Sequence, residues 1–178
     1  MNKKIRFITE TAVMLALLIA LQTLTRPLGQ WVTGSCVNAV LAVTVLVAGL
    51  GSGITVAVIS PVLAYLLGIA PQILTVPAIM VGNAVFVLVL HFVADKTVVR
   101  KIAAWLAAAA VKFAALYAIV VWLICDVFAE KLLASGALKA PMLKALPVSF
   151  GITQLFTALI GGGVALLIAS TLRKALRK

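Results

Sequence analysis

Acidic residues are scarce in this chain, and their scarcity limits the chemistry it can perform. The 178 residues include only four carboxylates, Glu10, Asp95, Asp126 and Glu130, and no two of them are placed to share a site. General acid–base catalysis relies on a histidine or a carboxylate held near the reacting group. The single histidine, His91, stands alone near the end of an apolar stretch. We therefore expect that the chain is not an enzyme.

Metal and nucleotide motifs are missing as well. Cys36 and Cys125 lack the spacing of a metal site, and we interpret them as small apolar fillers. The glycines of residues 49–53 lack the lysine of a phosphate-binding loop, so they indicate a tight turn between two apolar segments. The sequence therefore predicts no metal and no cofactor.

Apolar residues, in contrast, make up 65% of the chain, and charged residues only 11%. The mean hydropathy is +1.26. A soluble domain is about 45–50% apolar and about 25% charged, and so short a chain has no core large enough to hide the excess. The composition predicts an all-α membrane protein with lipid as its main solvent.

The net charge of +11 lies at the ends of apolar runs instead of along a helix face. This placement argues against nucleic-acid binding and follows the positive-inside rule. Three basic clusters stand out: Lys3, Lys4 and Arg6; Lys96, Arg100 and Lys101; and Arg173, Lys174, Arg177 and Lys178.

Six membrane-spanning helices fit this charge pattern, because a span needs about 20 mostly apolar residues. Six crossings place all three clusters, and both termini, in the cytoplasm of a cell-membrane protein. Lys131, Lys139 and Lys144 are exceptions on the outside, in a segment at 126–147 that has room for a short amphipathic helix. The first helix resembles a signal peptide but lacks a cleavage pattern, so we interpret it as uncleaved. The expected helices form one domain and cover 7–24, 36–50, 54–67, 72–94, 102–124 and 148–172, with a polar outer segment at 25–35.

Lys112 is the most informative residue. It lies about ten residues into the helix at 102–124, so it is about 15 Å from either surface. A charge at this depth costs roughly 2.5–3.5 kcal/mol on insertion scales. The sequence offers no acid at matching depth, so a bound anionic ligand is the expected counter-ion. The alternative is that Lys112 is neutral or donates to backbone carbonyls.

Other polar residues gather in the outer half of the expected bundle. Amides in membrane helices often only bond neighbouring helices, and that alternative stays open for each one. Their shared position nevertheless predicts a polar pocket that opens to the outside, with Lys112 as its floor. Trp31 is either a lid or an interface anchor. The candidate binding residues are Lys112, Asn83, Gln154, Asn38, Tyr117, Gln22 and Trp31.

Small residues recur every four positions on two of the helices. Ala12, Ala16 and Ala20 form one smooth face of the first helix. Gly161, Ala165 and Ala169 do the same on the last helix. Such faces let another helix approach closely, either within the bundle, which we favour for the last helix, or from a partner.

The chain resembles the substrate-binding (S) components of energy-coupling factor (ECF) transporters, which import vitamins and related micronutrients. The residues that carry the resemblance are the basic start leading into the apolar run at 11–21, Ser60-Pro61 followed by Gly68, and the stretches at 81–84 and 154–162. The six-helix plan in under 200 residues matches too.

The resemblance implies a transmembrane coupling subunit docked on Ala12, Ala16 and Ala20, and two cytoplasmic ATPase subunits. It also implies a small-molecule substrate held in the outer half, but no motif identifies the vitamin. A scaffold or assembly protein without a ligand is the alternative.

Overall fold

The backbone of the computed structural model is helical, without a strand, over the residues that the structure describes. These are residues 2–69, 72–93 and 97–176, with the side chains of 170 and 173–176 left out. In chain order the elements are α1 (Lys3–Thr25), η1 (Arg26–Leu28), α2 (Gln30–Ala48), α3 (Leu50–Leu66), η2 (Ile73–Thr75), α4 (Val76–Val93), α5 (Val98–Leu116), η3 (Tyr117–Val127), α6 (Ala129–Ala134), α7 (Ala140–Phe150) and α8 (Ile152–Leu176).

Five of the described helical segments are long and apolar enough to cross a membrane. They are Lys3–Leu28, Gln30–Ala48, Ile73–Val93, Val98–Val127 and Ala140–Ala169. α3 is apolar but has only 17 residues, which is the lower limit for a span. The fold is therefore that of a multi-pass membrane protein with an apolar helical bundle.

Several elements differ in extent from the sequence expectation. The segment at 25–35, expected as a polar loop, is instead η1 followed by the start of α2 at Gln30. The segment at 126–147 holds α6 and most of α7, and α8 begins at Ile152 instead of residue 148. The helix expected at 102–124 begins at Val98 and ends in the π-helix η3. Lys96 of the second basic cluster lies outside the described residues.

Glycines with a positive φ explain why two of these connections are so short. Gly29 (φ 86°) joins η1 to α2, and Gly49 (φ 90°) alone joins α2 to α3. Only glycine adopts this backbone region at little cost, so a single residue is enough to reverse the chain between two helices.

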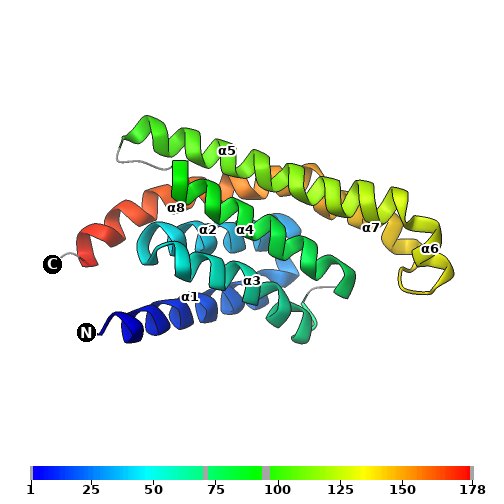
Figure 1. Ribbon diagram of the computed structural model, residues 1–178, viewed down its shortest axis with the longest axis horizontal. Helices are drawn as coiled ribbons and strands as arrows, with labels where there is room; N and C mark the ends of the chain where they lie inside the picture. Colours follow the sequence, from blue (N-terminus) through cyan, green and yellow to red (C-terminus); the bar gives the residue numbers. More distant parts are fainter. Residues whose placement is uncertain (1, 70–71, 94–96, 177–178) are drawn as a thin grey trace.

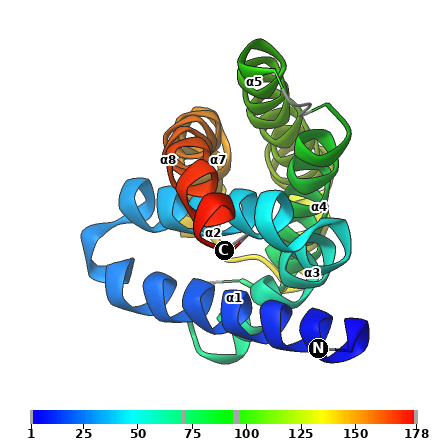
Figure 2. The same cartoon turned by 90° about the vertical axis from the view of Figure 1, so that its left-hand side faces the viewer.

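The long helices run back and forth along the bundle, and the start of α1 and the end of α8 lie at the same end of it (Figure 1). α2 lies in the middle, between α1 and α8 (Figure 2), and also packs against α3 and α4. α6 and α7 lie toward the opposite end from the start of α1 (Figure 1).

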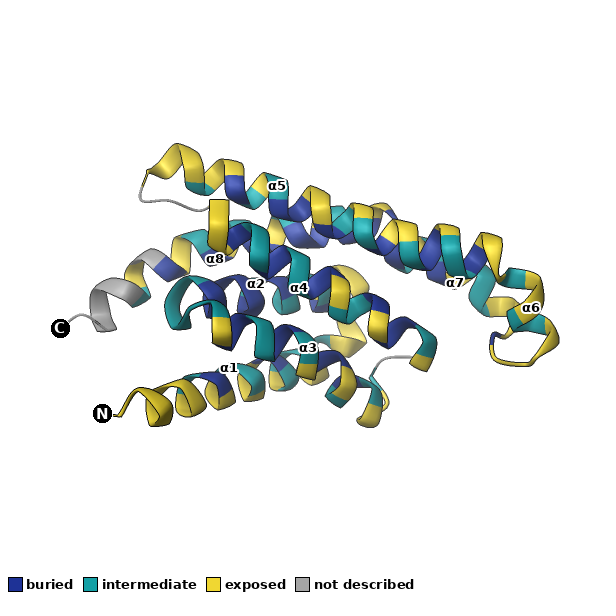
Figure 3. Ribbon diagram, viewed as in Figure 1, coloured by how far each residue is buried: buried dark blue, intermediate teal, exposed yellow. Residues whose placement is uncertain are grey.

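Burial divides the helices into central and peripheral ones (Figure 3). α2 is buried along most of its middle, whereas α1 buries only Thr11 and Leu18. Two separate apolar clusters form the core. The larger cluster contains residues of α1, α2, α3, α4, α5 and α8. The smaller cluster contains residues of α4, α5, η3 and the α6–α7 hairpin.

Candidate functional site

A polar cavity of about 150 Å³ lies among α1, α2, α4, α5 and α8. An apolar cavity of this volume holds a molecule of about the size of benzene, so the space suits a small ligand. Its lining residues are Gln22, Arg26, Gly29, Gln30, Thr33, Gly34, Val37, Asn38, Ile69, Ile79, Asn83, Lys112, Leu116, Phe150 and Gln154.

The cavity lies at the boundary between the two apolar clusters. On α5, Lys112 follows Ala109 of the larger cluster and precedes Leu116 of the smaller one. On α4, Asn83 likewise stands between Ala78 and Phe86. Polar side chains therefore occupy the level of the bundle where neither cluster fills the space.

Lys112 is buried, with 3% of its surface exposed, and its partners are side-chain amides. Its Nζ donates to Asn38 Oδ1 at 2.6 Å and to Asn83 Oδ1 at 2.7 Å. The ring of Phe86 lies 5.5 Å from Nζ, within the range of a cation–π interaction. The bonds tie α5 to both α2 and α4, and they involve amide oxygens instead of the backbone carbonyls considered above.

These partners leave the lysine without a compensating negative charge. An ammonium has three donors, and the two amides accept two of them. No carboxylate is among the residues that line the cavity. A buried charge is stable when it is both hydrogen-bonded and paired, so the cavity favours an occupant that brings an anionic group to Nζ.

Close packing of α2 against α8 positions Asn38. A Cβ on Gly161 would lie 2.7 Å from Asn38 Cβ, and a Cβ on Gly34 would lie 3.1 Å from Thr157 Cγ2. Asn38 Nδ2 also donates to Thr157 Oγ1 at 3.4 Å. The two glycines thus bring the helices together at the level of the cavity.

Gln154 and Asn83 keep polar groups free for a ligand. Gln154 Nε2 donates to the carbonyl of Ser149 at 2.9 Å, while its Oε1 has no hydrogen-bond partner among the described residues. Asn83 is 1% exposed, and its Oδ1 accepts from Lys112, so its Nδ2 is a donor without a described partner. Gln154 Oε1 and Asn83 Nδ2 therefore add an acceptor and a donor to the wall near Lys112.

Five of the seven candidate binding residues come together in this cavity: Lys112, Asn83, Gln154, Asn38 and Gln22. Tyr117 and Trp31 do not line it. Tyr117 is 47% exposed and packs against Phe113, and Trp31 is 51% exposed and stacks on Phe156.

Four polar or aromatic lining residues were not among the sequence candidates. These are Arg26, Gln30, Thr33 and Phe150. Arg26 follows Gln22 by four residues, and Gln30, Gly34 and Asn38 repeat every four residues, so each set shares one helical face. The four-residue repeat is present in the sequence, but the polar residues of 25–35 favour a loop over a helix.

The two small-residue faces have different surroundings. On α8, Gly161, Ala165 and Ala169 are buried inside the bundle. On α1, Ala12, Ala16 and Ala20 are exposed, and so are the neighbouring Val13 and Leu17. The face on α8 packs internally, whereas the face on α1 is open to lipid or to a partner helix.

Comparison of the chain with protein-family models, with curated proteins and with solved structures finds no match. Fold and site together describe a multi-pass membrane protein with a buried lysine at a polar cavity.

Proposed function

We propose that the protein is the substrate-binding subunit (S component) of an ECF-type ABC importer in the cell membrane. It captures a small water-soluble vitamin or related micronutrient that carries an anionic group. The observation that carries this proposal is Lys112, which lies buried at a polar cavity whose described lining has no carboxylate.

The proposal includes six crossings with both termini in the cytoplasm. α3 is then the shortest span, and the positive clusters at both ends of the chain face inward. The cavity is lined by residues around the end of α1 and the start of α2, so it opens toward the outside, where a substrate for import is captured.

Coupling to ATP requires partners, namely a transmembrane coupling subunit and two cytoplasmic ATPases. The exposed alanine face of α1 supports a contact with the coupling subunit, because small side chains let a second helix approach closely. Ala16→Phe should abolish co-purification with the coupling subunit while leaving the melting temperature unchanged. Co-purification that is unaffected would place the contact elsewhere.

A scaffold without a ligand is the second candidate, and one observation favours it. The bonds from Lys112 to Asn38 and Asn83 join three helices, as expected of polar residues that only hold a bundle together. In that case the cavity is a by-product of packing.

Thermal unfolding of the purified protein in detergent distinguishes the two functions. We expect one member of a panel of anionic, neutral and cationic vitamins to raise the melting temperature. A ligand at about 100 times its Kd adds about 2.7 kcal/mol to the free energy of unfolding. A panel without any hit would support the scaffold.

The anion hypothesis is tested with Lys112→Met, which keeps an unbranched side chain of similar length but removes the charge. The shift caused by the ligand should disappear in this variant, because the ammonium is the proposed anchor. Lys144→Met removes an exposed lysine on α7 and should keep the full shift. An unchanged shift in Lys112→Met would exclude Lys112 as the anchor.

A further inference from the structure

The cavity has a cationic side chain at each end. Lys112 lies at the buried end, whereas Arg26 is exposed and lines the mouth. The Arg26 guanidinium has neither an ion pair nor a hydrogen bond with the described residues, and its five donors are therefore free for a ligand.

The N-terminus of α2 adds a second positive element at the same mouth. Gly29 and Gln30 line the cavity, and no side chain caps α2 there. The N–H groups of Gln30, Trp31 and Val32 have no backbone partner among the described residues, as is usual for a first helical turn. Such a terminus attracts anions through these N–H groups and the helix dipole.

α2 connects the two positive ends and sets the distance between them. Gln30 and Asn38 lie on one face of α2 and line the mouth and the floor. Eight residues at 1.5 Å each separate them by about 12 Å. An occupant that reaches from the mouth to the floor is therefore elongated.

The wall between these ends excludes other ligand classes. Its polar members are mostly amides, with one buried donor at Asn83 Nδ2 facing this space. Phe150 is the one aromatic residue among the lining side chains. The cavity therefore offers no pair of aromatic rings between which a flat ligand could stack. A cationic ligand would be repelled by the two positive side chains, and no lining carboxylate would attract it.

We propose that the cavity takes an elongated dianion. Lys112, held by Asn38 and Asn83, binds one anionic group, and Arg26 with the first turn of α2 binds the other. This inference rests on the proposed function and specifies its substrate class. Arg26 is then a specificity-determining residue that selects for a second anionic group.

Calorimetric titration of the full chain in detergent tests this inference with simple probes. Succinate, glutarate, adipate and suberate vary the distance between two carboxylates, and the monoamide of each acid removes one charge at constant length. We expect at least one dicarboxylate to bind about tenfold or more tightly than its monoamide, because a charge-assisted pair is worth about twice a neutral hydrogen bond. Arg26→Gln should reduce the dicarboxylate to the affinity of the monoamide, and Arg26→Lys should restore part of the difference.

Lys144→Gln, an exposed lysine on α7 outside the cavity lining, is the matched control and should change neither affinity. Equal affinity for acid and monoamide, or a preference that survives Arg26→Gln, would overturn the dianion while leaving a binding subunit in place. Binding of a cationic or neutral vitamin without any carboxylate would likewise overturn the dianion while leaving a binding subunit in place. The absence of binding by every probe and every vitamin would overturn both the dianion and the proposed function.

Discussion

Lys112 owes its position to amides on two other helices. Because Asn38 and Asn83 both present Oδ1 to Nζ, the three side chains form one bonded unit at the level between the two apolar clusters. Removing one member leaves buried groups without partners, which costs about 1–3 kcal/mol. Replacing both members of a pair by apolar residues is less costly, because no polar group is then left unsatisfied.

A double-mutant cycle on Asn83 and Lys112 tests this unit. Asn83→Leu and Lys112→Met should each lower the free energy of unfolding by about 1–3 kcal/mol. The double variant should be more stable than the sum of the two losses predicts, by about 0.5–3 kcal/mol. Denaturant unfolding in detergent gives all four values.

Thr11 supplies the control for this cycle. It is buried on α1, its Oγ1 donates to Ser52 Oγ, and it does not line the cavity. Thr11→Val combined with Lys112→Met should therefore be additive within about 0.5 kcal/mol. Additivity in the Asn83 cycle as well would show that the bond between Lys112 and Asn83 contributes no coupling.

The expectation that Lys112 faces the bundle interior agrees with its 3% exposure, and no acid is among the lining residues. The sequence did not predict the amide partners. Which residues face each other depends on how each helix is rotated about its axis, and that rotation is set by packing. Trp31 and Tyr117 show the same limit, since both are exposed and neither lines the cavity.

α2 and α8 approach each other closely beside the cavity. Gly161 permits it, because a side chain there would meet the backbone of α2 at Ser35 and Ala39 as well as Asn38. Backbone atoms cannot move aside as a flexible side chain can.

Gly161→Ala should lower the free energy of unfolding by about 1–3 kcal/mol, the usual cost of overpacking. Gly51→Ala is the matched control on α3. The nearest atom to its new Cβ is Cε2 of Phe7, at 3.1 Å, and Phe7 is 42% exposed and free to move. There the higher helix propensity of alanine, about 1 kcal/mol, should keep or raise stability. Thermal unfolding that ranks the two variants in the opposite order would contradict this packing.

The length of the apolar runs predicts which segments are helical more reliably than it predicts where each helix begins and ends. The runs that become α1, α4, α5 and α8 are long enough to predict helices. The start of α2 was missed because Gln30, Thr33 and Ser35 are polar, although here they are helical; Gln30 and Thr33 line the cavity. The π-helix η3 was not predictable, since its hydrogen-bond spacing leaves no clear pattern in the residues.

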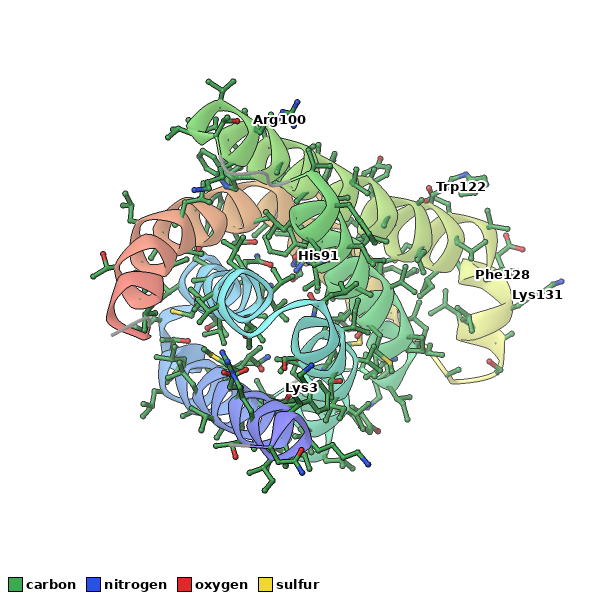
Figure 4. The ribbon with its side chains drawn as sticks, turned by 60° about the vertical axis from the view of Figure 1, so that its left-hand side comes forward. Lys3, His91, Arg100, Trp122, Phe128 and Lys131 are labelled. Carbon is green, nitrogen blue, oxygen red and sulfur yellow. The ribbon has the colours of Figure 1, made fainter. Side chains whose placement is uncertain are left out.

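At the scale of the whole molecule, helix direction agrees with charge. The start of α1 and the end of α8 lie at one end of the bundle (Figure 1). An even number of crossings fits this arrangement, and the six crossings proposed above would make α3, with its 17 residues, the shortest of them. Trp122 and Lys131 lie near the α6 end and point away from the bundle (Figure 4), consistent with an interface rich in aromatic and charged side chains.

Cysteine labelling of whole cells tests the crossing of α3. The background variant replaces Cys36 and Cys125 by alanine, and single cysteines are then introduced as Ala137→Cys, in the turn between α6 and α7, and Val98→Cys, at the start of α5. Both positions are exposed. With six crossings, a membrane-impermeant maleimide should label position 137 in intact cells, and position 98 only after permeabilisation. If α3 turned back without crossing, α4 would begin on the opposite side and the two positions would exchange their labelling. The result therefore decides whether the cavity opens toward the outside, as capture of an imported substrate requires.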